Sequence, residues 1–303
     1  MQQPGRDQYF AEIRASAAQL AEIASAHDQN LPVPGCPDWT LRQLATHLGR
    51  VHRWAAEIVS IRAAERIPFD SAPDGRYPAE PAERAAWLNA GAERVIAAIA
   101  AAGDEPVWAF GGLAPAGFWA RRQSHETMVH RADAELAVGR DVVLDAGLAV
   151  DGIDEWLAAV TTYWQRGDGS AALPVGAVLH VRATATEPGG SLFASGTADW
   201  LISSTPDGLA AQRGPGDTVL ADTVPADSVL AKTVPADTAQ PRPMQASSVQ
   251  AIPVRPRPDV SVSGPAGRLL LVLLRRLPAD DPSIRVTGDT TLLTGWLAGT
   301  PFR

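Results

Sequence analysis

Apolar side chains recur every three or four residues along the first half of the chain. This spacing places them on one face of a helix, and it predicts helices at about residues 6–27, 40–64, 81–102, 117–138 and 146–164. Thr40 and Gln43 form a capping box at the start of the second helix, and Gly139 suits the end of the fourth. The first half is therefore expected to be an all-helical bundle.

The second half changes to an alternation of apolar and polar positions, which is typical of strands. Strands are predicted at about residues 179–186 and 192–202, with shorter ones at 260–263 and 283–287. The apolar run 267–277 and residues 290–298 predict two further helices. We therefore expect two domains, a helical bundle at residues 1–166 and a small mixed α+β domain at residues 171–303.

An insertion at about residues 213–258 interrupts the second domain. Residues 217–241 repeat a five-residue unit, beginning D-T-V-L-A and D-T-V-P-A. A pentapeptide-repeat solenoid needs an apolar residue at the centre of each unit, where this chain has Thr or Ser, and prolines in alternate units remove backbone donors. We predict a flexible surface insertion instead.

Composition and charge narrow the classes of partner. At 303 residues and 46% hydrophobic content, the chain can bury the cores of two domains. A net charge of −8 and a pI near 5.3 argue against nucleic acid or an anionic membrane as a partner. The single cysteine, Cys36, excludes an intramolecular disulfide framework and a Cys-rich zinc site. No leader-like segment or membrane-spanning apolar run is evident, so we expect a cytoplasmic protein.

The helix at residues 117–138 carries the candidate chemistry. Buried charges are costly unless they are paired or bound to a metal. Glu126 and His130 lie one helical turn apart, so both side chains can grip one ion. Their stripe is expected to point inward and also holds Trp119, Arg122 and Asp133. A core-like stripe holds His125 and Val129, and the residues expected on a solvent-facing side are Arg121, Ser124, Arg131 and Glu135.

Zinc accepts histidine nitrogen and carboxylate oxygen, and its catalytic sites use three protein ligands and leave one position open. A histidine of the helix at residues 40–64 would complete the set. His47 and His52 lie on two adjacent apolar stripes of that helix, and the residues alone do not choose between them. The alternative is a buried ion network in which Glu126 and His130 pair with Arg122 or Arg53.

Three stretches of the chain resemble the mycothiol-dependent maleylpyruvate isomerase family. The first is V-P-G-C-P-D-W-T-L-R-Q-L-A-T-H-L-G-R-V-H-R-W at residues 33–54, and the second is W-A-R-R-Q-S-H-E-T-M-V-H-R-A-D-A-E at residues 119–135. Residues 263–289 are similar to the smaller C-terminal α/β domain of that family. The resemblance implies an α + α/β fold, in which a DinB-like metal-binding bundle precedes a small mixed α+β domain.

The metal ligands that the resemblance implies are His47, Glu126 and His130, which selects His47 over His52. His52 and His125 are then expected to be hydrogen-bonded helix histidines.

The resemblance also implies a catalytic arginine in the C-terminal domain. Alignment on P-A-D-D selects Arg276, and Arg275 is the fallback because L-R-R-L-P replaces the G-R-R-P of the family. Cys36 is expected to be a small turn residue, because the family's nucleophile is the thiol of the cofactor. Trp119 and Arg122 are expected to be walls of the cofactor pocket.

The function implied is that of an enzyme that uses zinc or another divalent metal together with mycothiol. The metal would hold the low-molecular-weight thiol as a thiolate, which adds to an electrophilic small molecule. The outcome is cis–trans isomerisation or thiol transfer, and Arg276 would bind a substrate carboxylate. Two alternatives remain open, a metal-dependent hydrolase on the same bundle and a non-catalytic metal-binding regulatory protein.

Overall fold

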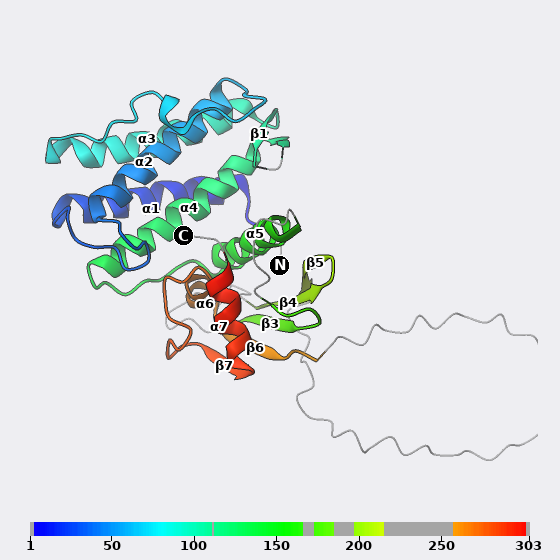
Figure 1. Cartoon of the computed structure of the whole chain (residues 1–303). Coiled ribbons are helices and arrows are strands. Elements are labelled where there is room, and N and C mark those ends of the chain that lie inside the picture. The colour runs from blue at the N-terminus through cyan, green and yellow to red at the C-terminus, as the bar shows by residue number, and fades with distance from the viewer. Residues whose placement is uncertain (1–2, 111, 166–172, 185–196, 215–256, 301–303) are drawn as a thin grey trace, which may run out of the picture.

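A computed structural model of the chain describes residues 3–110, 112–165, 173–184, 197–214 and 257–300 (Figure 1). The helices expected in the first half are present. They are α1 (Arg6–Ala26), α2 (Leu41–Ser60), α3 (Pro81–Ala102), α4 (Gly117–Ala137) and α5 (Ala146–Gln165).

The first four helices form a bundle, seen at one end of the molecule in Figure 1. Helices α1 and α2 each pack against both α3 and α4, so α2 and α4 are neighbours in the bundle. The contact between α2 and α3 is close because Gly49 has no side chain. A Cβ atom at Gly49 would lie 2.0 Å from the Trp87 ring.

The predicted helix ends are confirmed at two points. The Thr40 side chain accepts from the Gln43 backbone N–H, and the Gln43 side chain accepts from the Thr40 N–H at 2.8 Å. Gly139 adopts the left-handed conformation after α4, with φ 71°. Helix α2 ends four residues earlier than expected, where Arg62 adopts a φ of 53°.

One face of α4 differs from the prediction. Ser124 and Arg131 were expected to face solvent, but both are buried. Arg131 donates to Ser16 of α1 at 3.1 Å, and Arg121 donates to Asp151 of α5 at 3.0 Å. The prediction was wrong because α4 contacts α1, α2 and α5, so its polar residues are paired within the protein.

A short hairpin joins α3 to α4, made of β1 (Pro106–Ala109) and β2 (Gly112–Pro115). No element was predicted there, because two strands of four residues are too short for a recognisable alternation. The Trp119 indole N–H donates to the Trp108 carbonyl at 2.9 Å, which ties the hairpin to the start of α4.

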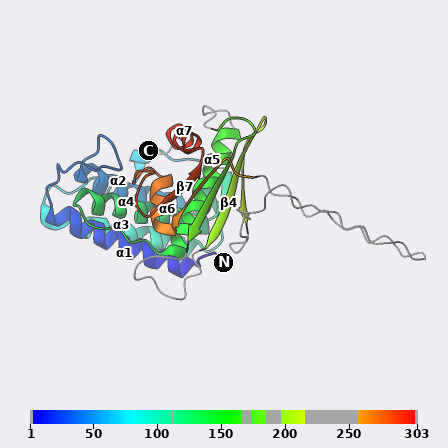
Figure 2. The same ribbon diagram turned by 90° about the horizontal axis from the view of Figure 1, so that it is seen from below.

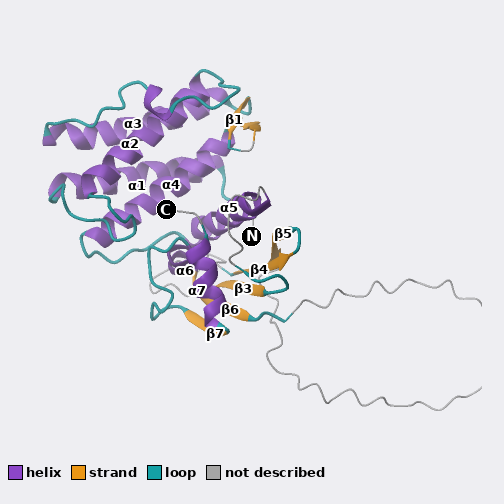
Figure 3. Ribbon diagram, in the orientation of Figure 1, coloured by secondary structure: helices purple, strands orange, loops and turns teal. Residues whose placement is uncertain are grey.

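The second half contains a mixed five-stranded sheet, as Figure 3 shows. In spatial order its strands are β5 (Gly208–Gly214), β4 (Ala198–Thr205), β3 (Val178–Thr184), β6 (Val260–Pro265) and β7 (Arg285–Gly288). Strands β3 and β6 are parallel and the other neighbours are antiparallel. With α6 (Ala266–Leu273) and α7 (Thr290–Gly299), this confirms the expected α+β architecture. Strand β5 was not predicted.

Helix α5 packs mainly against α6 and β5 and makes few contacts with α4. Figures 1 and 2 place α5 and α6 between the bundle and the sheet. Buried side chains of α1, α5, α6 and the sheet form one continuous apolar cluster. The expected boundary at residue 166 assigned α5 to the bundle, whereas its apolar face packs on the second domain. We propose a boundary between α4 and α5.

The predicted insertion at residues 213–258 lies mostly outside the described residues and stays a prediction. None of the helices in the described ranges combines the length and apolarity needed to cross a bilayer.

Candidate metal centre

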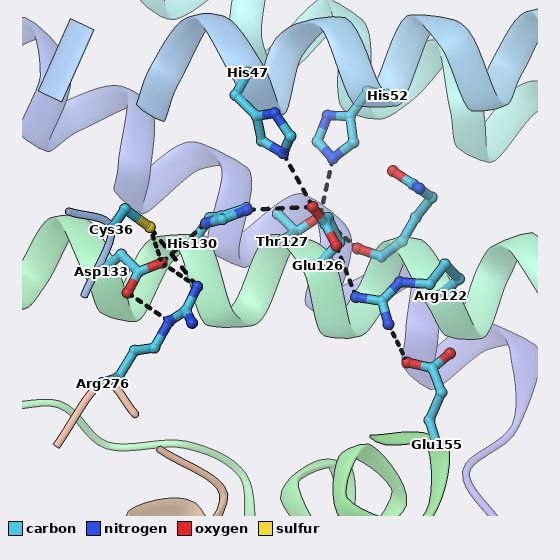
Figure 4. A network of polar contacts seen from close by, with 11 residues as sticks. Cys36, His47, His52, Arg122, Glu126, Thr127, His130, Asp133, Glu155 and Arg276 are labelled. Atoms are coloured by element: carbon cyan, nitrogen blue, oxygen red, sulfur yellow. Dashed lines mark hydrogen bonds and ion pairs between the residues drawn. The ribbon is translucent and has the colours of Figure 1, made fainter. Parts of the chain in front are cut away.

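Three of the predicted side chains converge between α2 and α4 (Figure 4). His47 Nε2 lies 3.1 Å from Glu126 Oε1, and His130 Nε2 lies 3.2 Å from the same oxygen. Together these atoms lie within 4.8 Å of one another. The i,i+4 spacing of Glu126 and His130 produces their half of the cluster, and the packing of α2 against α4 brings in His47.

The Glu126 carboxylate is held on both oxygens. Its Oε2 accepts from Arg122 at 2.7 Å, and Arg122 also donates to Glu155 of α5 at 2.5 Å. Burial alone would raise the pKa of Glu126, but Arg122, together with His130 and His47, lowers that pKa well below its usual range. Glu126 is therefore an anion whose Oε1 faces the two imidazoles.

His130 is oriented from its other ring nitrogen. Its Nδ1 lies 2.9 Å from Asp133 Oδ2, and Asp133 is fully buried. Burial alone would lower the pKa of His130, but Asp133, with Cys36 and Glu126, raises it well above its usual value. Because the carboxylate accepts the Nδ1 proton, the ring is oriented so that Nε2 faces the cluster.

These residues fit a divalent metal. Arg122 hydrogen-bonds to Glu126 Oε2, and Asp133 hydrogen-bonds to His130 Nδ1. The remaining ligand atoms, the Nε2 atoms of His47 and His130 and Oε1 of Glu126, face one another. Such a donor set suits zinc and leaves room for a further ligand. The side chains of His47 and Glu126 keep 28% and 21% exposure, so the cluster can be reached from solvent. Trp39 packs on His47 at that side, with ring centroids 4.8 Å apart.

The other two helix histidines have partners of their own. His52 is fully buried and its Nε2–H donates to Thr127 Oγ1 at 2.9 Å, while Thr127 donates to a backbone carbonyl. Burial lowers the pKa of His52 to about 3, so its ring is neutral. His125 lies between Asp151 and Glu155 of α5, at 3.1 and 2.9 Å. Neither belongs to the three-residue cluster.

Of the two residues expected to line the cofactor pocket, Arg122 lies at the cluster and Trp119 does not. Arg122 lies beside the cluster as the bridge between Glu126 and Glu155. Trp119 is fully buried among the aromatic side chains near the hairpin, 5.5 Å from Trp54 between ring centroids. It shares a stripe with Glu126 but lies two turns away along α4, where its ring completes the aromatic core.

Arg276 reaches the site from the second domain. Its Nε donates to Asp133 Oδ1 at 3.1 Å, and its Nη2 lies 3.7 Å from Cys36 Sγ. Cys36 is buried, with its thiol 3.4 Å from Asp133 Oδ2. Arg275, the fallback in the sequence, adopts a φ of 59° at the end of α6.

Sequence reasoning missed two parts of this arrangement. Asp133 follows His130 by three residues, a spacing that could have identified it as the imidazole's partner. Asp151 and Glu155 are one turn apart on α5, which could have identified paired acids on an otherwise apolar helix. Which basic residues they meet depends on contacts between distant segments.

Taken together, the fold and the site define a two-domain α + α/β protein with a candidate metal centre inside its helical bundle. Residues 9–135 match the family model for the mycothiol maleylpyruvate isomerase N-terminal domain, and residues 147–295 match that for the MDMPI C-terminal domain. The chain therefore belongs to the mycothiol-dependent maleylpyruvate isomerase family.

Two similar solved structures are crystal structures of the mycothiol-dependent maleylpyruvate isomerase, one of them a point mutant. Each is 13% identical to this chain, with a TM-score of 0.50. The matched region covers 89% of this chain and 90% of the solved chain. At this identity the likeness supports the shared fold. No curated protein sequence matches the chain.

Proposed function

We propose that this protein is a divalent-metal enzyme that uses mycothiol to act on an electrophilic small molecule, by cis–trans isomerisation or thiol transfer. The observation that carries the proposal is the convergence of His47, Glu126 and His130 on one point between α2 and α4. Membership of the family supports mycothiol as the thiol.

The three residues would hold zinc or another divalent metal. Bound there, the metal would lower the pKa of a thiol that occupies its remaining position. Arg122 balances the charge of Glu126, and Asp133 keeps the proton of His130 on Nδ1. The first contact keeps the carboxylate ionised and the second leaves Nε2 as the ring nitrogen that faces the site, so a bound metal would displace only the proton on Nε2.

The chain's own thiol is a poor candidate for the nucleophile. Cys36 is the only cysteine, it is buried, and its Sγ contacts Asp133 and Arg276. A thiol supplied from solvent can instead approach past the partly exposed His47. This favours a reaction in which the reactive sulfur belongs to a small molecule.

The test begins with metal content. Protein stripped with a chelator and reloaded should hold about one zinc or cobalt ion per chain. Adding mycothiol to the cobalt form should produce a sulfur–cobalt charge-transfer band, and S-methyl mycothiol, which has no free thiol, should not. Thiol-dependent isomerisation of maleylpyruvate would identify the isomerase activity, and a stable adduct with an electrophile would identify thiol transfer.

Two results would contradict the proposal. In the first, mycothiol leaves the spectrum of the cobalt-loaded protein unchanged, and the metal-loaded protein hydrolyses an ester or amide. The protein would then be a hydrolase. A metal-loaded protein inert toward both kinds of substrate would support a regulatory role.

A further inference from the structure

Asp133 is a buried carboxylate on which three distant segments meet. It has no exposed surface, and it accepts from His130 on its own helix, from the Cys36 thiol in the loop before α2, and from Arg276 after α6. Its two oxygens thus receive contacts from both domains (Figure 4). An isolated buried carboxylate is costly, so these donors keep it charged and in place.

The loop before α2 leaves room for this contact. A Cβ atom at Gly35 would lie 2.4 Å from Asp133 Oδ1 and 3.0 Å from Arg276 Cγ. Glycine is therefore required by close approach, because any larger residue would displace the carboxylate or the arginine.

The backbone after α6 aims Arg276 at the bundle. The helix ends at Leu273, four residues earlier than the sequence predicts, and Arg275 turns the chain with a φ of 59°. The Arg276 N–H then donates to the Leu271 carbonyl at 2.7 Å, and its Nη1 donates to the Leu274 carbonyl at 2.8 Å. The guanidinium is held by its own segment before it meets Asp133.

We propose that Asp133 and Arg276 are positioning residues for the metal ligand His130, and that through them metal affinity depends on docking of the C-terminal domain. Asp133 accepts the Nδ1 proton of His130, which directs the ring's Nε2 toward Glu126 and His47. Arg276 holds Asp133 in the geometry that this requires. The inference rests on the proposed function only in taking His130 as a ligand.

This role differs from the one implied by family resemblance. The Arg276 side chain is only 6% exposed, and each of its three nitrogens has a partner in the protein, namely Asp133, Leu274 and Cys36. Binding a substrate carboxylate would require breaking the contact with Asp133. We therefore assign Arg276 to holding the site rather than to the substrate.

Competition with a chromogenic chelator measures zinc affinity. The absorption spectrum of the cobalt-loaded protein reports the geometry of the metal ligands. Asp133→Ala should weaken zinc binding by about ten- to hundredfold and change the cobalt spectrum. Arg276→Met should weaken binding in the same direction. Asp133→Asn combined with Arg276→Met removes both charges together, so no unpaired charge stays buried, and it should fold while still binding zinc less tightly.

Asp199→Asn is a matched control. Asp199 is equally buried and accepts from His180 Nε2 at 2.9 Å, but in the sheet. The Asp199→Asn substitution should lower the free energy of unfolding without changing zinc affinity. A nitrogen-15 spectrum of the zinc-loaded protein should show a hydrogen-bonded Nδ1–H of His130 in the wild type, and the signal of this proton should shift or disappear in Asp133→Ala.

The outcomes separate the two proposals. A wild-type chain that binds no zinc would overturn the proposed function and this inference together. Wild-type zinc affinity and cobalt spectrum in Asp133→Ala, or in the double variant, would overturn this inference alone and leave the proposed function standing.

Discussion

Glu126 contacts most of the charged and ionisable side chains of the site. Its Oε2 accepts from Arg122, and its Oε1 faces both His47 and His130. Glu126→Gln keeps the size of the side chain and one oxygen but removes the charge. If the carboxylate is a ligand, zinc affinity should fall at least about tenfold, as measured by chelator competition. Near-normal zinc content with lowered stability would instead mean that Glu126 serves only to neutralise Arg122.

The two histidines of α2 offer a contrasting pair. His47→Ala removes a partly exposed residue of the candidate metal centre, so under the proposed function the chain should lose zinc and keep most of its stability. His52→Ala opens a cavity at a fully buried ring, so it should cost about 2–4 kcal/mol and leave zinc content unchanged. Urea unfolding and metal analysis on both variants check this. If His52→Ala lost zinc and His47→Ala kept it, His52 rather than His47 would be the metal ligand.

A pH effect follows from Asp151, which contacts His125, Arg121 and Tyr9. Burial alone would raise its pKa, but these three groups outweigh burial and lower the pKa from 3.8 to about 2. A depressed pKa contributes stability above the unfolded value, and this is lost as the pH falls through the folded value. Asp151 should thus contribute about 2 kcal/mol above pH 4, lost by about pH 2.

Urea unfolding of the wild type and of Asp151→Asn from pH 6 to pH 2 measures this contribution. The difference in the free energy of unfolding should shrink between about pH 4 and pH 2. A difference that stays constant over this range would show that the ionised carboxylate of Asp151 is not what stabilises the fold.

At the residue scale, the local half of the site was predictable from the sequence. Glu126 and His130 follow from helical spacing alone, whereas His47 was separated from His52 only by family resemblance. The bond between Arg276 and Asp133 joins positions 143 residues apart, and no periodicity encodes such a contact. Its geometry also depends on the early end of α6, where Arg275 adopts a left-handed backbone.

At the scale of elements, periodicity predicted helices well and their packing partners poorly. Helix α5 was placed correctly along the chain, but its apolar face packs against α6 and β5 rather than the bundle. On the side of α4 that was expected to face solvent, Ser124 and Arg131 are likewise buried. An amphipathic pattern shows that a face is covered, and it does not identify the covering element. The hairpin strands β1 and β2 were missed because each is only four residues long.

The loop before α2 gives a prediction at this scale. Gly35→Ala would place a methyl group 2.4 Å from Asp133 Oδ1. It should therefore destabilise the chain by about 1–3 kcal/mol and also weaken zinc binding. Thermal unfolding and chelator competition measure the two effects. Gly117→Ala is the control, because the added methyl group would lie 3.8 Å from Arg6 Nη2, an ordinary contact distance, and alanine favours the helix. Unchanged zinc affinity in Gly35→Ala would separate the loop from the metal centre.

At the scale of the whole molecule, the two domains share an apolar cluster and several polar contacts, and two of these contacts form bridges to the candidate metal centre. Arg122 links Glu126 to Glu155 of α5, and Asp133 bonds to Arg276 after α6. Each bridge ends on a residue of the candidate metal centre or on its direct partner. The order of domains and the fold class were predictable from the change of periodicity along the chain. The docking of the domains was not, because it depends on which faces meet.

The strand order sets a condition on the predicted insertion. Strands β5 and β6 run parallel and are separated by β4 and β3. Three strand spacings amount to about 14 Å, and Gly214 and Val260 align with β3 positions three residues apart, which adds about 10 Å along the strands. A connection between parallel strands also has to cross a face of the sheet, which takes about a dozen residues.

Replacing residues 217–258 should therefore succeed or fail according to linker length. A Gly/Ser linker of about fifteen residues can make the crossover, so the melting temperature and the zinc content should stay close to wild type. A linker of about four residues would leave only about seven residues between Gly214 and Val260, fewer than the dozen or so that a connection across a face of the sheet takes, so β6 could not pair properly with β3 and α6 could not present Arg276 to Asp133. That variant should unfold at a lower temperature and bind zinc more weakly. Thermal unfolding and metal analysis compare the two deletions with the full chain. Equal losses with both linkers would show that the removed residues contribute packing of their own, and the prediction of a dispensable insertion would be wrong.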